Sequence, residues 1–210
     1  MDEEMMKTLK NRGERDMSRV QTIGLDISKH RSQVHAEDEH GRKMFNRQLK
    51  REEVTAFFAA LPPCLVGMEA CGGSHHQARE ISESGHDVEL LHPRRVKPFV
   101  INNKTDAADA RAICEVVRRP DIDFVNVKTV GQQHLSALDR VRERLIADRT
   151  ALANQIRGLL HEEGVILPQG IAHLRHRLPG LIEISSQLHE ASRILFMELH
   201  AELIGLDTKI

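Results

Sequence analysis

The pattern of hydrophobic and polar positions changes once along the chain. From residue 20 to about 92, short apolar runs rich in β-branched residues lie between polar stretches, which is typical of strands joined by helices. From 104 onward the apolar residues recur every three or four positions, which predicts helices. We therefore expect two domains, at 20–130 and 131–210. Residues 1–19 lack an apolar period, and we expect them to be disordered or to precede the true start.

The first domain is predicted to be α/β. Three strands come first, the second and third joined by the hairpin loop Asp-Glu-His-Gly at 38–41. A helix that stops at Pro62-Pro63 follows, and then strand, helix, strand and helix, which together predict a mixed sheet with helices packed on it. We expect strands at 22–28, 33–37, 43–49, 64–69 and 87–91, and helices at 52–61 and 74–84.

The second domain is predicted to be a long helical hairpin. Leucines recur one heptad apart over 131–163, at Leu138, Leu145, Leu152 and Leu159. A second apolar repeat covers 181–206, after a linker marked by Pro168, Gly170, Pro179 and Gly180. Two antiparallel helices of this kind form a coiled coil, and their apolar stripe suits either packing within the chain or a second copy of the protein.

Composition narrows the partners and the compartment. The 30 Lys and Arg against 31 Asp and Glu give a net charge of −1, so attraction to nucleic acid must come from local patches. No apolar run approaches the roughly 18 residues of a membrane-spanning helix, so we expect no membrane partner. Three cysteines fit neither a disulfide framework nor paired zinc ligands, which favours the reducing cytoplasm. We expect Cys71 and Cys114 to be small packing residues.

Four acidic residues lie at the ends of apolar strands or near the start of a helix. Asp26 ends the first apolar strand and Glu69 ends the fourth, and a buried carboxylate costs free energy unless it is paired or holds a metal. Asp106 and Asp109 lie one turn apart near a helix start. Four carboxylates meeting at one sheet edge would suit Mg²⁺ or Mn²⁺ and phosphodiester cleavage. Alternatively, the Asp106 and Asp109 pair serves as an ordinary helix cap.

The region around the helix acids is locally basic. Residues 92–119 contain seven Lys and Arg against three acids, a local excess of +4. We expect four of these side chains to contact a nucleic-acid backbone near the metals, and the alternative is a solvated surface without a ligand. The four are Arg94, Arg95, Lys97 and Lys104.

Several segments together resemble the DEDD transposases of bacterial insertion sequences, a family that includes the Piv DNA invertase. The resemblance covers nearly everything from Val20 to the C-terminus, and each motif is weak by itself while the combination is specific. The segments are Ile-Gly-Leu-Asp-Ile-Ser-Lys at 23–29, Gly-Met-Glu-Ala-Cys-Gly-Gly at 67–73, Lys-Pro-Phe-Val at 97–100, Asn-Lys-Thr-Asp-Ala-Ala-Asp-Ala at 103–110, Ala-Ile-Cys-Glu at 112–115 and Asn-Gln-Ile-Arg-Gly-Leu-Leu at 154–160.

The resemblance implies a RuvC-like, ribonuclease-H-type first domain, and it implies that Asp26, Glu69, Asp106 and Asp109 are the metal ligands. It further implies DNA strand exchange at a specific target, guided in some elements by an RNA from the element itself. DNA, and for some elements a guide RNA, would then be the partners. The helices from Gly131 onward match the region that assembles the family into dimers and tetramers.

One departure from the family affects the expected activity. Family members carry a C-terminal domain with a serine nucleophile, whereas this chain stops at Ile210 before any such segment. We therefore expect a shortened transposase that does not complete recombination alone. The alternatives are a junction-resolving nuclease with the same four acids, a non-catalytic regulator that binds nucleic acid or full-length transposase, and an actin-like ATPase. The ATPase is disfavoured because no second glycine-rich phosphate motif is present.

Overall fold

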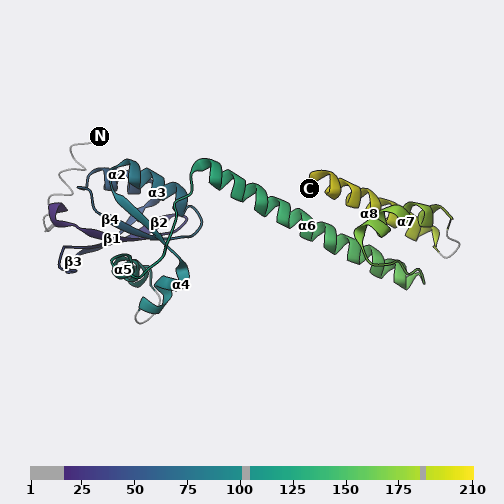
Figure 1. Cartoon of the computed structure of the whole chain (residues 1–210), viewed down its shortest axis with the longest axis horizontal. Coiled ribbons are helices and arrows are strands. Elements are labelled where there is room, and N and C mark those ends of the chain that lie inside the picture. The colour runs from purple at the N-terminus through teal and green to yellow at the C-terminus, as the bar shows by residue number, and fades with distance from the viewer. Residues whose placement is uncertain (1–16, 101–104, 185–187) are drawn as a thin grey trace. The chain divides into compact units, whose positions relative to one another are not determined.

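The computed structural model describes residues 17–100, 105–184 and 188–210. The chain divides into two compact units, Met1–Gly131 and Gln132–Ile210. Unit 1 contains the sheet and the helices around it, and unit 2 contains only helices (Figure 1). No helix in these three ranges is both long enough and apolar enough to cross a membrane.

The sheet of unit 1 has six strands in the order β3-β2-β1-β4-β5-β6. The first three strands form an antiparallel meander, β4 and β5 run parallel to β1, and β6 is antiparallel to β5. The predicted mixed α/β sheet is therefore confirmed, and the first and fourth strands are neighbours in it. The bounds are β1 Thr22–Ile27, β2 Arg31–Glu37, β3 Lys43–Lys50, β4 Leu65–Glu69, β5 Asp87–Leu91 and β6 Phe124–Val125.

Helices cover both faces of this sheet (Figure 1). On one face, α2 (Val54–Ala59) and α3 (Ser74–Glu83) pack against alternate residues of the central strands and bury Phe58 and Ile81. On the other face lie α4 (Pro93–Val96) and α5 (Asp106–Val117). Short 3₁₀ turns precede β1, precede α2 and follow α4, at Met17–Arg19, Arg51–Glu53 and Lys97–Phe99.

Two glycines let α5 lie directly on the sheet. A Cβ atom at Gly24 would stand 2.0 Å from the carbonyl oxygen of Ala110 and 2.5 Å from the amide of Cys114. At Gly67 in β4, a Cβ atom would meet the side chain of Val117 at 2.7 Å. These distances are shorter than van der Waals contact, so the close approach of α5 requires glycine in both strands.

The described residues of unit 2 form three helices, so the expected two-helix hairpin is wrong in one respect. The long helix α6 (Val130–Glu162) appears as predicted, but α7 (Ile171–Ile184) forms where we expected a linker, and α8 begins only at Glu190 and runs to Lys209. The reason is that Leu174, Leu178 and Ile182 recur every four residues and are buried, and their burial outweighs the cost of Pro179 inside the helix.

Charged residues join α6 and α8 in an antiparallel arrangement. Asp207 near the end of α8 accepts from Arg149 of α6 and from Arg175 of α7, both at 3.0 Å. At the other end of the pair, the Ser192 hydroxyl donates to Glu163, just after α6. The Asp207 side chain is only 14% exposed, and removing its charge from water costs free energy. The ion pairs with the two arginines offset this cost.

The segment before α6 is fixed to α3 within unit 1. The amide of Lys128 donates to His75 Nδ1 at 3.2 Å, and Arg79 donates to the carbonyl oxygen of the same residue. The backbone amide and carbonyl groups of Lys128 are therefore both hydrogen-bonded to side chains of α3 rather than to the backbone of a strand or helix. His75 thus has a structural role.

Candidate metal and nucleic-acid site

Asp26 and Glu69 lie next to each other on the sheet. In the parallel pair of β1 and β4, Leu25 is opposite Met68, and each acid is the next residue in its strand. Leu25 and Met68 point into the core beneath α2 and α3, so the alternation of a strand places both acids on the opposite face, beneath α5. Both carboxylates are half-buried at the carboxyl end of the strands.

The thiol of Cys71 is close enough to both carboxylates for their charges to affect its pKa. Burial, and then the negative charges of Glu69 and Asp26, raise the pKa of Cys71 above its ordinary value. The two carboxylates and the thiol therefore share one region of negative potential. Our expectation that Cys71 is a packing residue is wrong, because it is exposed, whereas Cys114 is buried against β1 as expected.

The first turn of α5 brings the other two acids to the same end of the sheet. Ala110 and Cys114 pack on Gly24, and the helix then runs toward the opposite end, where Arg118 pairs with Glu37 at 2.8 Å. The beginning of α5 therefore lies toward the carboxyl end of β1. Asp106 is exposed there and Asp109 is half-buried.

The two helix acids are not required as caps. Thr105 is the N-cap residue, and its hydroxyl accepts from the amide of Ala108 at 3.2 Å. Asp106 and Asp109 thus remain available for another role, although both also interact favourably with the helix dipole.

A polar cluster on β2 and β3 holds this first turn, which the sequence did not predict. Asn46 donates to the carbonyl oxygen of Ala107, between the two acids, at 3.3 Å, and also to His35 Nδ1 at 3.1 Å. The other ring nitrogen of His35 lies 3.2 Å from a carboxylate oxygen of Glu37. Burial lowers the pKa of His35, so the neutral imidazole donates from Nε2 and accepts at Nδ1.

The four carboxylates do not meet as one tight cluster. Across residues 17–100, 105–184 and 188–210, no three His, Cys, Asp or Glu side chains lie close enough together to hold a metal ion. This arrangement still fits Mg²⁺, because that ion commonly takes only one or two protein carboxylates and completes its shell with water and substrate phosphate oxygens.

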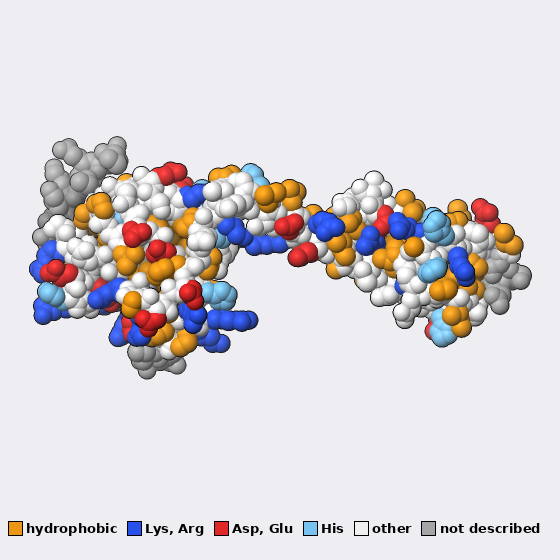
Figure 2. Space-filling model, viewed as in Figure 1, with side chains coloured by type: hydrophobic (Ala, Val, Ile, Leu, Met, Phe, Trp, Pro, Cys, Tyr) orange, Lys and Arg blue, Asp and Glu red, His pale blue; other side chains and the backbone are white. Residues whose placement is uncertain are grey.

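Most of the predicted nucleic-acid residues are on the surface that follows β5. Arg94 and Lys97 are exposed, and Arg95 is exposed but pairs with Asp123 at 3.2 Å. Lys104 lies outside the described residues. In Figure 2, Lys and Arg side chains gather around the position of α4. Further along, Arg119 stacks on Phe99 at 4.3 Å, which fixes the turn after α4 against α5.

The fold and these acids define a class of protein. A mixed sheet with an antiparallel meander, two parallel strands and carboxylates at the ends of its first and fourth strands is the arrangement of a RuvC-like, ribonuclease-H-type domain. A family model described as a transposase, DEDD_Tnp_IS110, matches residues 23–164. The chain therefore belongs to the DEDD transposase family.

Relatives with curated descriptions agree with this family. The chain is 40% identical over 183 residues to the transposase for insertion sequence element IS1328 of Yersinia enterocolitica, covering 83% of this chain and 55% of the relative. It is 53% identical over 144 residues to the "Probable family 20 transposase" of Pseudomonas aeruginosa, covering 69% and 43%. With the transposase for IS1111A of Coxiella burnetii the identity is 38% over 198 residues, covering 93% and 54%. The chain spans about half the length of these relatives.

Proposed function

We propose that unit 1 is the metal-dependent, strand-cleaving part of an insertion-sequence transposase, with Asp26, Glu69, Asp106 and Asp109 as ligands of Mg²⁺ or Mn²⁺. The observation that carries the proposal is the placement of Asp26 and Glu69 side by side, each directly after the paired residues Leu25 and Met68 of two adjacent parallel strands. Carboxylate oxygens are hard ligands that suit a divalent cation such as Mg²⁺. Family membership supports the same assignment.

The four acids are carried by two kinds of secondary structure. Asp26 and Glu69 come from the two central strands of the sheet, and the residues before them, Leu25 and Met68, are fully buried. Asp106 and Asp109 come from the end of a helix, which Asn46 ties to β3. A divalent ion bound here would polarise a phosphodiester and stabilise the charge that develops on its oxygens. The protein's part is to hold the carboxylates so that the ion and the phosphate meet in one position.

DNA is the proposed substrate, and the exposed cations after β5 are its proposed contacts. Arg94 and Lys97 lie on the segment that leaves the carboxyl end of β5, next to the strand that carries Glu69. Lys104, by its position in the sequence, would add to them. Arg95 is a weaker candidate because Asp123 already compensates its charge.

Titration of the whole chain with Mn²⁺ by calorimetry tests the metal site. We expect Asp26→Asn and Glu69→Gln each to abolish or strongly weaken binding while circular dichroism shows a folded protein. Asp87→Asn is the matched control, because Asp87 is an exposed acid at the start of β5, at the other end of the same sheet. It should bind Mn²⁺ as the unmodified chain does.

Equal Mn²⁺ binding by the unmodified chain and Asp26→Asn would contradict the metal assignment. DNA binding by the unmodified chain without any cleavage in Mg²⁺, together with equal binding by Asp26→Ala, would favour the non-catalytic regulator. Cleavage of branched DNA in Mg²⁺ with water as the nucleophile would favour the junction-resolving nuclease, which shares the four acids.

We also propose that unit 2 mediates self-association. Leu135, Leu138 and Val141 form an exposed apolar stretch in the first half of α6, where burial against a second copy would remove apolar surface from water. A guide RNA and the cytoplasmic setting stay predictions.

A further inference from the structure

A row of polar side chains continues from the acids across the sheet. Asp26 is opposite Gln33 of β2, and Gln33 is opposite Gln48 of β3. Because paired residues in adjacent strands point to the same face, the row Gln48, Gln33, Asp26 and Glu69 spans four strands beneath the start of α5. Gln48 is exposed and Gln33 is half-buried.

Hydrogen bonds fix the side chains of this row. Arg31 donates to Gln48 at 2.7 Å, across the β2 and β3 pair. Gln33 donates to Asn46, the same side chain that holds the carbonyl oxygen of Ala107 in α5. Gln33 is therefore connected through Asn46 to the turn that carries Asp106 and Asp109. The guanidinium of Arg31 is held beside Gln48, at the β3 end of the row.

Two cations face each other at this edge of the sheet. Arg31 is directly opposite Lys50 in the register of β2 and β3, and both side chains are exposed. Like charges directly opposite each other destabilise a strand pair. Lys50 pairs with the exposed Glu52 at 3.8 Å, and a solvent-exposed pair of this length compensates the charge only weakly. A polyanion bound at this edge would relieve the repulsion.

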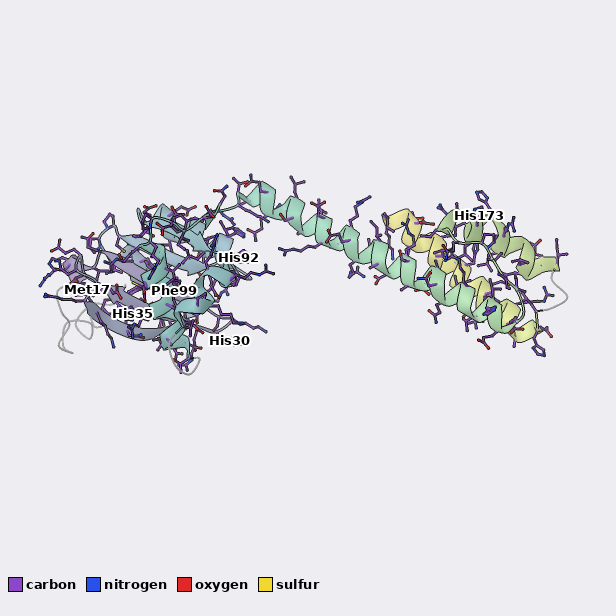
Figure 3. The ribbon with its side chains drawn as sticks, turned by 60° about the horizontal axis from the view of Figure 1, so that its bottom comes forward. Met17, His30, His35, His92, Phe99 and His173 are labelled. Carbon is purple, nitrogen blue, oxygen red and sulfur yellow. The ribbon has the colours of Figure 1, made fainter. Side chains whose placement is uncertain are left out.

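The turn between β1 and β2 belongs to the same end of the sheet. It presents the exposed residues Lys29 and His30, and the amide of Arg51 donates to the carbonyl oxygen of His30 at 3.1 Å, which joins the turn to the end of β3. Figure 3 shows His30 and His92 toward one end of unit 1 and Met17 toward the other. The acids thus lie between two basic surfaces, one from β2 and β3 and one after β5.

We propose that Arg31, Gln48 and Lys50 form a second phosphate-binding arm for the nucleic acid that the metal site cleaves. The ligand is the phosphodiester backbone, which the two cations would attract without regard to sequence, while the Gln48 amide donates to phosphate or sugar oxygens. The proposal rests on the proposed function and adds a contact surface on the side of the acids opposite to Arg94 and Lys97.

The geometry sets where the arm would bind along the strand. From Gln48 to Glu69 there are three inter-strand spacings of about 4.8 Å, or roughly 14 Å. The arm would therefore contact a different phosphate of the backbone from the one at the acids.

Salt dependence of DNA binding tests the arm. A fluorescein-labelled DNA duplex is titrated with the whole chain at increasing NaCl concentration, and binding is followed by fluorescence anisotropy. Each lost phosphate contact reduces the slope of log Kobs against log[NaCl] by about 0.9, so Arg31→Ala/Lys50→Ala should reduce it by about 1.8. Arg31→Lys/Lys50→Arg keeps both charges and should retain the slope.

Arg42→Ala is the matched control. Arg42 is an exposed cation on the same β2 and β3 hairpin, at its other end, and its removal should leave the slope unchanged. A double variant that is folded, binds Mn²⁺ normally and keeps the full slope would overturn the arm while leaving the proposed function intact. It would leave Lys50 as a charge on the edge strand β3 that prevents strand pairing with other chains. Failure of the unmodified chain to bind the duplex would overturn both the arm and DNA as the substrate.

Discussion

The two units bury their apolar residues to different extents. In unit 1 both faces of the sheet are covered, and the core residues beneath α2, α3 and α5 are almost fully buried. In unit 2 only the second half of α6 packs on α7 and α8. Of the eleven large apolar side chains that are exposed in the described chain, nine lie in unit 2. Unit 1 is therefore complete as a folded body, whereas unit 2 has apolar surface suited to binding another protein.

The largest effect is expected from closing the space between β1 and α5. Gly24→Ala would place a methyl group inside the contact distance of two backbone atoms, which cannot rotate away. We expect a loss of about 3 kcal/mol in the free energy of unfolding of unit 1, measured by chemical denaturation. Gly72→Ala is the control, since nothing lies within 4 Å of its added methyl group, and it should change stability by less than about 0.5 kcal/mol. Equal effects of the two substitutions would show that α5 does not pack tightly on the sheet.

A smaller effect is expected within the heptad leucines of α6. Leu152 is 6% exposed and packs in the core of unit 2, whereas Leu138 is 65% exposed. Leu152→Ala should cost about 2 kcal/mol because it leaves a cavity. Leu138→Ala should change the stability of the monomer by less than about 0.5 kcal/mol. Thermal denaturation at low protein concentration measures both, and a costly Leu138→Ala under those conditions would mean that the first half of α6 is covered.

Self-association should depend on the exposed apolar residues of α6 rather than on the buried ones. We expect Leu138→Glu to weaken a dimer at least tenfold, which corresponds to about 1.4 kcal/mol, because it places a charge in the apolar stretch. Ala147 lies nine residues further along α6, half a turn around the helix from Leu138, so Ala147→Glu is a control with the same added charge. Sedimentation equilibrium would measure both dissociation constants. Equal weakening by the two substitutions would exclude the Leu138 side as the contact.

The smallest effect concerns pH and unit 1. His35 is surrounded by Glu37, Lys43 and Arg111, and burial, its main influence, holds its pKa below the ordinary value. The unfolded chain therefore binds more protons than the folded chain as pH falls below about 6.5, and stability decreases there. We expect His35→Gln to flatten this decrease between neutral and mildly acidic pH, as measured by denaturation at each pH. An unchanged pH dependence would assign the effect to other groups.

The sequence predicted unit 1 better than unit 2 for physical reasons. Apolar strands with glycines and polar turns have a strong local signal, whereas the pairing of β1 with β4 joins segments that are distant in the sequence. In α7, Pro179 and Gly180 indicate a linker locally, whereas the burial of Leu174 and Leu178 stabilises a helix. The two-residue strand β6 has too little pattern to detect.

The candidate site was predictable only in part. Asp26 and Glu69 could be identified because an acid after an apolar strand is unusual in any sequence. Gln33 and Gln48 could not, because their alignment with Asp26 depends on the register of three strands, which local patterns do not determine. Asn46 was missed for the same reason, since its partner Ala107 is 61 residues away.

The attachment of Lys128 to α3 has a consequence for hydrogen exchange. Its amide lies in a segment without regular structure, where exchange is ordinarily fast, yet it donates a hydrogen bond to a ring nitrogen of His75. Its exchange with deuterium should therefore follow the opening of α3 rather than that of a surface loop. By this kinetic criterion Lys128 is the last residue of the cooperative sheet unit, although it belongs to neither a strand nor a helix.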